Sequence, residues 1–380
     1  MRTVTLIRGA RQLLTLRGPT GPRRGADLRN LGIIQDGAVL IADGLILEVG
    51  HSRRLENLAL ARGATEVDAS GCVVMPGFVD GNLQLLGGTD LSPRALKTPA
   101  LRKLDDAVRY GTTAVEAKSG AGFTEAAELK ILRLYAEFKE LPLTFVPTFL
   151  AGYVADGFGE RFLATLRRRK LAEFAEIRCE DGAFTPAQAC QFLARARELR
   201  FGVKMSAGHR SRPDSITMAI ERAAVAVDDV TNASEREASI LAQSQTMVTM
   251  SPAVAFHLQA ECYPPARMLI DSGAAVALAS GWHPECAPPP NMQMTIGLAC
   301  RSMNMTVAEA ITASTINGAH AIGRAEIVGS IEAGKRADLT ILAVPDYREL
   351  PYHFGVNLVN SVMISGTILV ERSKVKWPLR

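Results

Sequence analysis

The chain has 380 residues, of which 47% are hydrophobic and 22% are charged, as is typical of a folded globular protein with a sizeable core. Its 43 basic and 39 acidic residues leave a formal charge of +4, which gives no reason to expect a nucleic-acid partner. No segment reaches the roughly 18 consecutive apolar residues that a membrane helix needs, so we expect no membrane partner either.

Six cysteines are scattered along the chain without any Cys-x-x-Cys spacing. This pattern favours reduced thiols in a cytoplasmic protein over a disulfide framework or a structural zinc site. The first residues alternate like a strand and contain no continuous apolar signal core. We therefore expect a cytoplasmic location.

Both ends of the chain show β patterns. Residues 3–49 contain short alternating apolar runs, and Asp43-Gly44 between two of them is a strong hairpin signal. Strand, turn and strand patterns return at 329–342 and 360–370. Because each terminal unit is too short to bury its own apolar face, we predict that residues 1–76 and 327–380 form one composite β-sandwich domain.

Strands and helices alternate in the middle of the chain, between residues 77 and 326. The eight candidate strands are residues 78–84, 112–118, 143–150, 174–179, 202–206, 224–229, 246–250 and 274–280. Helix starts are marked by capping boxes that begin at Thr185 and at Thr306. Eight strands are what a (β/α)₈ barrel requires, so we predict an α/β fold with a TIM-type barrel over 77–326.

The stretch that opens the first barrel strand is Val73–Gln84. An apolar run and a Pro-Gly turn lead into a strand that ends in two alternating polar residues, Asn82 and Gln84. Side chains two apart on a strand point the same way, so we expect both to face the barrel mouth. The same alternation puts Glu116 and Lys118 on one face of the second strand, where Lys118 is either an anchor for an anion or one half of an ion pair.

Three motifs carry a resemblance to a known family. They are the sequences at residues 116–122 (EAKSGAG), 178–184 (RCEDGAF) and 345–357 (PDYRELPYHFGVN), and together they resemble the imidazolonepropionases, a branch of the amidohydrolase superfamily. The resemblance covers nearly the whole chain. It implies a metal-dependent hydrolase, using zinc or iron, that opens a C–N bond in a cyclic amide, and a homodimer as the oligomeric state.

The family's site positions can be placed on this sequence one at a time. Its two strand-1 histidines, strand-5 histidine, general-base glutamate, strand-6 histidine and strand-8 aspartate fall on Asn82, Gln84, Ser206, His209, Asp229 and Gly281. None of the recognised metal ligands is present. Neutral amides and hydroxyls have little affinity for zinc, so we predict that the protein uses no metal or other cofactor.

The remaining polar residues at the predicted mouth define a candidate site. We assign His209 and Asp229 as a candidate acid–base pair. Two alternatives remain for them: ordinary polar loop residues, or, together with His283, the ligands of a rebuilt metal site. The candidate ligand-binding residues are Asn82, Gln84, Lys118, Tyr153, Ser206 and His283. With Lys118 supplying positive charge, we expect the ligand to be a small polar or anionic molecule.

Three functions remain open at this point. The first is a relative that has lost the metal site and binds a small ligand without catalysis. The second is a metal-independent hydrolase that acts on a small cyclic amide through His209 and Asp229. The third is a conventional metal-dependent amidohydrolase, which is disfavoured because no shift of register brings a histidine to Asn82 or Gln84.

Overall fold

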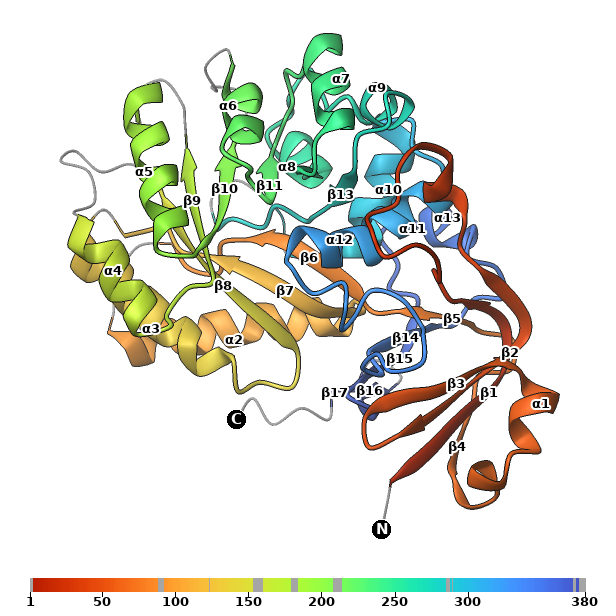
Figure 1. The fold of residues 1–380 in the computed structure, drawn as a ribbon. Coiled ribbons are helices and arrows are strands. Elements are labelled where there is room, and N and C mark those ends of the chain that lie inside the picture. The colour runs from red at the N-terminus through yellow and green to blue at the C-terminus, as the bar shows by residue number, and fades with distance from the viewer. Residues whose placement is uncertain are drawn as a thin grey trace.

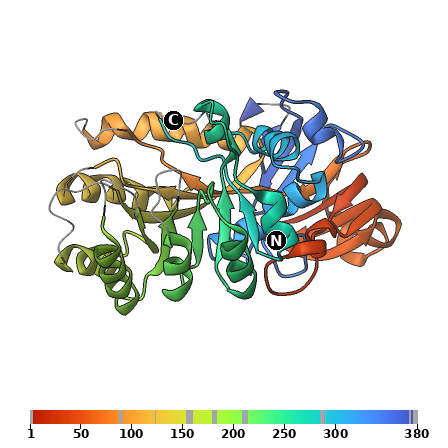
Figure 2. The ribbon, with the colours of Figure 1, turned by 90° about the horizontal axis from the view of Figure 1, so that it is seen from above.

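The computed structural model describes residues 3–87, 92–122, 124–152, 160–178, 184–207, 214–284, 288, 290–371 and 374–375. A barrel of strands and helices fills one side of the molecule, and a sheet built from both ends of the chain lies beside it (Figure 1). The view from above shows the same two parts next to each other (Figure 2). No helix within these described residues is long and apolar enough to cross a membrane.

Eight parallel strands form the barrel, and each pairs with its neighbour in the sequence. They are β6 (Phe78–Leu83), β7 (Thr112–Lys118), β8 (Thr144–Ala151), β9 (Phe174–Arg178), β10 (Gly202–Ser206), β11 (Ala226–Asp228), β12 (Met247–Met250) and β13 (Val276–Leu278). The predicted (β/α)₈ barrel is confirmed, and the observed strands coincide closely with the predicted ones. The alternation of apolar runs and helical periodicity was therefore sufficient to locate them.

Helices surround the barrel strands. They are α2 (Pro93–Arg109), α3 (Glu125–Phe138), α4 (Glu160–Arg168), α5 (Pro186–Glu198), α6 (Ser215–Glu221), α7 (Glu235–Gln243), α8 (Pro252–His257), α9 (Ala266–Asp271), α10 (Met292–Ser302), α11 (Val307–Ala313) and α12 (Ile316–Ala321). The predicted capping boxes at Thr185 and Thr306 are both formed, each with a reciprocal side-chain bond. These caps satisfy backbone N–H groups that a helix start leaves without partners.

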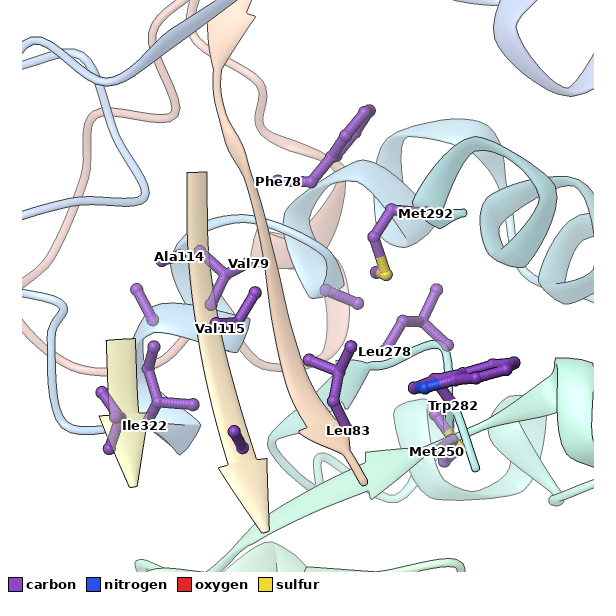
Figure 3. Packing of buried hydrophobic residues seen from close by; sticks show 14 of the residues in the cluster. Phe78, Val79, Leu83, Ala114, Val115, Met250, Leu278, Trp282, Met292 and Ile322 are labelled. Carbon is purple, nitrogen blue, oxygen red and sulfur yellow. The ribbon is translucent and has the colours of Figure 1, made fainter. Parts of the chain in front are cut away.

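The barrel closes at a seam between β6 and the end of β13 without a continuous ladder. The backbone N–H of Gln84 donates to the carbonyl oxygen of Trp282 at 2.7 Å. The backbone N–H of Ser280 donates to a carboxylate oxygen of the fully buried Asp80 at 2.9 Å. Figure 3 shows Trp282 near Leu278 at this seam. The seam therefore holds the ends of the first and last strands together at the barrel mouth.

The second part is a nine-stranded sheet built from the N-terminal and C-terminal segments of the described chain. Its strands are β1 (Val4–Leu14), β2 (Ile33–Ala42), β3 (Leu45–His51), β4 (Thr65–Asp68), β5 (Val73–Pro76), β14 (Leu339–Leu342), β15 (Val359–Ile364), β16 (Thr367–Glu371) and β17 (Lys374–Val375). Short helices α1 (Ser52–Glu56) and α13 (Glu349–Tyr352) and the 3₁₀ turns 25–29 and 59–63 complete the fold. The predicted fold class, a barrel with a strand domain drawn from both terminal parts of the chain, is confirmed, whereas the domain bounds 1–76 and 327–380 stay predictions.

The strand β5 lies between a strand from the N-terminal part of the chain, β1, and a strand from the C-terminal part, β14. It runs parallel to β1 on one side and antiparallel to β14 on the other. One buried core collects Ile7 and Val39 from the N-terminal strands with Leu339 and Met363 from the C-terminal strands. The second part is thus one continuous sheet, and strands from both terminal parts of the chain share its core.

The barrel core lies between the strands and the surrounding helices. Figure 3 shows Val79 and Val115 of the first two strands, together with Ile322, which follows α12, among the buried hydrophobic residues of this core. Burial of such aliphatic side chains contributes about 1.5–3 kcal/mol each relative to the exposed state. This packing fixes the outward faces of β6 and β7, so the alternate residues of both strands point toward the barrel axis.

Candidate functional site at the barrel mouth

Asn82 and Gln84 are anchored to different strands at the mouth. The side-chain N–H₂ of Asn82 donates to the hydroxyl of Ser251 at 3.3 Å and to the carboxylate of Asp229 at 3.5 Å. The side-chain N–H₂ of Gln84 donates to the carbonyl oxygen of Ser119 at 2.8 Å. Gln84 is 5% exposed, whereas Asn82 is half-buried. The two amides therefore connect β6 to the ends of β7, β11 and β12.

Asp229 directly follows β11 and faces Asn82. Its backbone has a positive φ of 59°, a left-handed conformation that aspartate tolerates better than most residues. The side chain is half-buried. Burial and the adjacent Asp228 carboxylate raise the pKa of Asp229 to about 6, against the opposing effects of Lys118 and of the Ser251 hydroxyl. Asp229 is thus a carboxyl group that changes charge close to neutral pH.

We predict that Asp229→Asn stabilises the protein at alkaline pH. Because the pKa of Asp229 is raised in the native state, its ionisation removes stability as the pH rises from about 4 through 6. Asparagine keeps the left-handed conformation and accepts the same hydrogen bonds without the charge. The expected gain is about 1–2 kcal/mol at pH 8, reduced from the full shift because the group is partly solvated.

Thermal unfolding at pH 5 and pH 8 checks this prediction. The matched control is Asp36→Asn, since Asp36 also has a positive φ, 48°, but is exposed on β2. A lower melting temperature for Asp229→Asn than for the wild type at pH 8 would contradict the prediction.

A network of buried charges lies on the inner faces of β7, β9, β10 and β11. The ammonium of Lys118 lies 2.7 Å from a carboxylate oxygen of Glu176 and also donates to Asp228. Lys204 pairs with Glu116 in the same way. All five side chains are at most 2% exposed. Such pairs are stable in a protein interior only when each charge has its partner.

The expectation that Lys118 supplies free positive charge at the mouth is wrong. Burial lowers the pKa of Lys118, but the carboxylates of Asp228, Glu176 and Glu116 outweigh it and the pKa is raised. The charge of the ammonium is therefore neutralised by the carboxylates around it. The Lys118 side chain is also only 2% exposed. Of the two roles predicted for Lys118, the ion pair is the one formed, although its partners are Glu176 and Asp228 rather than Glu116.

Ser206 completes the inner face of β10. Its hydroxyl donates to the second carboxylate oxygen of Glu176, and the residue is 8% exposed. Glu116 accepts from the Thr148 hydroxyl at 2.6 Å. The sequence analysis missed Glu176, although a single charged residue between the apolar residues of its strand marked the position. Ser206 is thus fixed by a hydrogen bond and retains only acceptor capacity.

Glu128 is a second residue that the sequence analysis missed. It lies on α3, is fully buried and accepts from the backbone N–H groups of Gly120 at 3.0 Å and of Gly122 at 2.6 Å. These bonds hold the segment that follows β7 at the mouth. Burial raises the pKa of Glu128 to about 7. Nothing in the helical pattern of α3 distinguished this glutamate from a solvent-exposed one.

Gly281 has no room for a side chain. Its φ is +66°, a left-handed conformation that strongly favours glycine. A Cβ atom at this position would lie 2.4 Å from a methyl carbon of Val254 and 2.6 Å from the Cβ of Ser251. Such approaches lie far inside van der Waals contact. The same Ser251 accepts a hydrogen bond from Asn82, so the space of a strand-8 ligand is filled by the polar cluster itself.

The residues at the family's metal positions do not fit a catalytic zinc or iron. Asn82, Gln84 and Ser206 offer only neutral oxygens, which have little affinity for zinc, and their N–H and O–H groups donate within the protein. Asp229 is the one carboxylate among the described residues at these positions. Gly281 offers no ligand atom. No group of three His, Cys, Asp or Glu side chains within the described parts of the chain is arranged to hold a metal ion.

Three of the predicted site residues need separate mention. His283 follows Trp282 at the seam and is half-buried. His209 and Tyr153 lie outside the described residues. The structure therefore brings together Asn82, Asp229 and, through the buried charge network, Ser206 and Lys118, whereas the pairing of His209 with Asp229 stays a prediction.

Comparisons with known proteins identify the family and the fold of the chain. Residues 73–369 match the Amidohydrolase family. The chain is 32% identical to the imidazolonepropionase of Alkaliphilus metalliredigens, covering 99% of this chain and 100% of that protein. It is 34% identical to the imidazolonepropionase of Parabacteroides distasonis, covering 96% and 98%. The solved adenosine deaminase from Xanthomonas campestris, with bound zinc, superposes with a TM-score of 0.76 at 16% identity over 98% of this chain and 94% of that one, a likeness in fold alone.

Proposed function

Since this chain belongs to the amidohydrolase family and is imidazolonepropionase-like, we propose that it is a member whose barrel binds a small polar molecule without a catalytic metal and does not hydrolyse it. The observation that carries the proposal is Gly281. A left-handed glycine enclosed by Ser251 and Val254 is a rebuilt position and not merely a missing ligand. A metal site reduced only by chance substitutions would leave space where the carboxylate had been.

The donor chemistry supports the same conclusion. Catalytic zinc takes about three ligands from histidine, carboxylate or thiolate side chains. Hydrolysis of an amide also needs an activated water, and in a metal hydrolase the ion supplies that activation. The neutral groups of Asn82, Gln84 and Ser206 offer neither the ligand set nor the negative charge.

The free cysteines in the described residues, Cys72, Cys190, Cys262 and Cys300, support a cytoplasmic location.

One observation favours a second candidate function, metal-independent hydrolysis of a small cyclic amide. Asp229 is half-buried at the carboxyl end of a barrel strand, where the active sites of TIM barrels lie. The pKa of Asp229 is raised to about 6, so its carboxylate can accept a proton near neutral pH, as a general base must. In this case Asp229 would take a proton from the attacking water, assisted by His209.

The experiment is a metal analysis combined with a hydrolysis assay. We expect the purified protein, after incubation with zinc or iron and dialysis, to hold far less than one metal ion per chain. We also expect no hydrolysis of imidazolone propionate, with the Alkaliphilus metalliredigens imidazolonepropionase as a positive control in the same assay.

Other outcomes separate the alternatives. One bound metal ion per chain together with chelator-sensitive hydrolysis would overturn the proposal. Hydrolysis that resists chelator but is lost in Asp229→Asn would instead support the second candidate, provided that Asp36→Asn keeps full activity.

A further inference from the structure

A pocket of about 300 Å³ opens on the nine-stranded sheet, and none of its lining residues belongs to a barrel strand. Its walls come from the residues that follow β1, from β2 and β3, and from residues 331–333, which precede β14. The N–H of Ile331 donates to the carbonyl oxygen of Thr15 at 2.8 Å, and the N–H of Gly334 donates to that of Ile46 at 2.8 Å. Ligand pockets in proteins begin at roughly this size. The pocket is therefore large enough for a small molecule, and hydrogen-bonded backbone frames it.

Aliphatic side chains form much of the pocket wall. They are Ile34 of β2, Leu47 and Val49 of β3, and Ile331. The strand β3 carries a bulge at this point, where Leu47 is an extra residue without a partner on β2. Bulges of this kind redirect side chains, and they are frequent next to binding sites. Ile34, Leu47 and Val49 are only half-buried, so a ligand could cover the apolar surface that they leave exposed.

Both acidic side chains at the pocket already have partners. A carboxylate oxygen of Glu48 lies 2.9 Å from the guanidinium of Arg54. Glu332 accepts a hydrogen bond from the hydroxyl of Ser330 at 2.6 Å, and the ammonium of Lys335 lies 3.7 Å from the same oxygen. A cation that entered the pocket would compete with these side chains for the two carboxylates. The acidic groups therefore do not favour a cationic ligand.

Arg17 is the charged side chain of the pocket that lacks such a partner. Its guanidinium forms no hydrogen bond or ion pair with the residues that the structure describes, and the residue is exposed. A guanidinium presents its N–H donors as a planar fork that matches the two oxygens of a carboxylate. Arg54 and Lys335 balance Glu48 and Glu332, so Arg17 leaves positive charge in excess among these five side chains. The pocket thus combines an apolar wall with one unpaired cation.

We propose that this pocket is a binding site, distinct from the barrel mouth, for a small monocarboxylate with a compact apolar body. The carboxylate pairs with Arg17, and the body covers the exposed surface of Leu47 and Val49. Burial of apolar surface supplies affinity in proportion to its area, and charge-assisted bonds to the guanidinium orient the ligand. A small inorganic anion lacks the apolar body and a neutral hydrocarbon lacks the charge, so each obtains only one of the two contributions. The proposal does not depend on whether the barrel binds a metal ion.

Calorimetric titration with three matched probes tests the charge and the apolar body separately. Phenylbutyrate carries both, phenylbutyramide replaces the carboxylate by a neutral amide, and butyrate lacks the ring. At neutral pH, we expect phenylbutyrate to bind with a Kd of about 1 mM or below, and each of the other two to bind at least about tenfold more weakly. Equal affinity for phenylbutyrate and its amide would refute the ion pair, and equal affinity for phenylbutyrate and butyrate would refute the apolar contact.

Two arginine variants show whether Arg17 is responsible. Arg17→Gln removes the charge at an exposed position, so we expect it to fold like the wild type and to lose about tenfold in phenylbutyrate affinity. Arg62→Gln is the control, since Arg62 is also exposed but lies in the 3₁₀ turn 59–63, outside the pocket lining. It should bind phenylbutyrate like the wild type. Thermal unfolding establishes that both variants are folded, and an unchanged affinity in Arg17→Gln would overturn the proposal.

Hydrogen exchange followed by mass spectrometry locates the bound probe. We expect phenylbutyrate to slow exchange at the amides of β3 and of residues 331–334, because a ligand that binds only the folded state suppresses local opening. Slower exchange confined to barrel residues such as 80–84 would place the probe elsewhere and contradict the assignment. An absence of any heat of binding at about 10 mM phenylbutyrate would contradict it as well.

Discussion

Replacing Lys118 by methionine is expected to lower the free energy of unfolding by about 3–5 kcal/mol, the cost of removing one partner of a buried ion pair. Methionine has a similar length and no charge, so the packing volume changes little. The loss comes from Glu176 and Asp228, whose carboxylates would remain in the barrel interior without a cation. Urea denaturation followed by circular dichroism measures the change.

Two further variants make the test specific. Lys97→Met removes an exposed ion pair, in which Lys97 lies 2.7 Å from Glu137, and should cost no more than about 1 kcal/mol. Adding Glu176→Gln and Asp228→Asn to Lys118→Met should recover part of the loss, because the neutral amides no longer need a counter-charge. If Lys118→Met and Lys97→Met had equal free energies of unfolding, the predicted contribution of the buried ion pairs would be contradicted.

Replacing Gly281 by aspartate is expected to destabilise the protein by about 2–6 kcal/mol and not to create a metal site. The left-handed backbone costs about 1–3 kcal/mol for a side chain other than glycine. Overpacking against Val254 and Ser251 adds about 1–3 kcal/mol. Urea denaturation measures the stability, and zinc titration measures the site.

The control for this substitution is Gly63→Asp. A Cβ atom at Gly63 would meet nothing within 4 Å, so that variant should be close to wild type in stability. The combined variant Asn82→His, Gln84→His, Ser206→His and Gly281→Asp should also fail to bind one zinc ion per chain, since its fourth ligand has no space. Stoichiometric zinc in a combined variant as stable as the wild type would show that the mouth had not been rebuilt around the glycine.

The barrel could be predicted from the sequence because the patterns that indicate its strands and helices are local. Apolar runs, turns and capping boxes each lie within a few residues of the element that they define, as at Thr185 and Thr306. Alternation along β7 also predicted that Glu116 and Lys118 share a face. These inferences need only the geometry of one strand or one helix.

The parts of the site that could not be predicted depend on contacts between distant strands. Lys118 was expected to attract an anion because its partners, Glu176 and Asp228, lie on strands far along the chain. A register of parallel strands across a barrel is not visible in any one segment. The closed space around Gly281 is likewise a property of Val254 and Ser251, which no local pattern connects to it.

The position of β5 between β1 and β14 has a consequence for synthesis on the ribosome. Val73, Val74 and Met75 of β5 are fully buried. The strand that pairs with one edge of β5, β14, begins at Leu339, far later in the sequence. During translation this edge therefore stays without a partner while the whole barrel emerges, and an apolar unpaired edge is a site for aggregation or chaperone binding. The last strands to be synthesised complete the first sheet to appear, so a chain released early would lack the closing half of its own N-terminal domain.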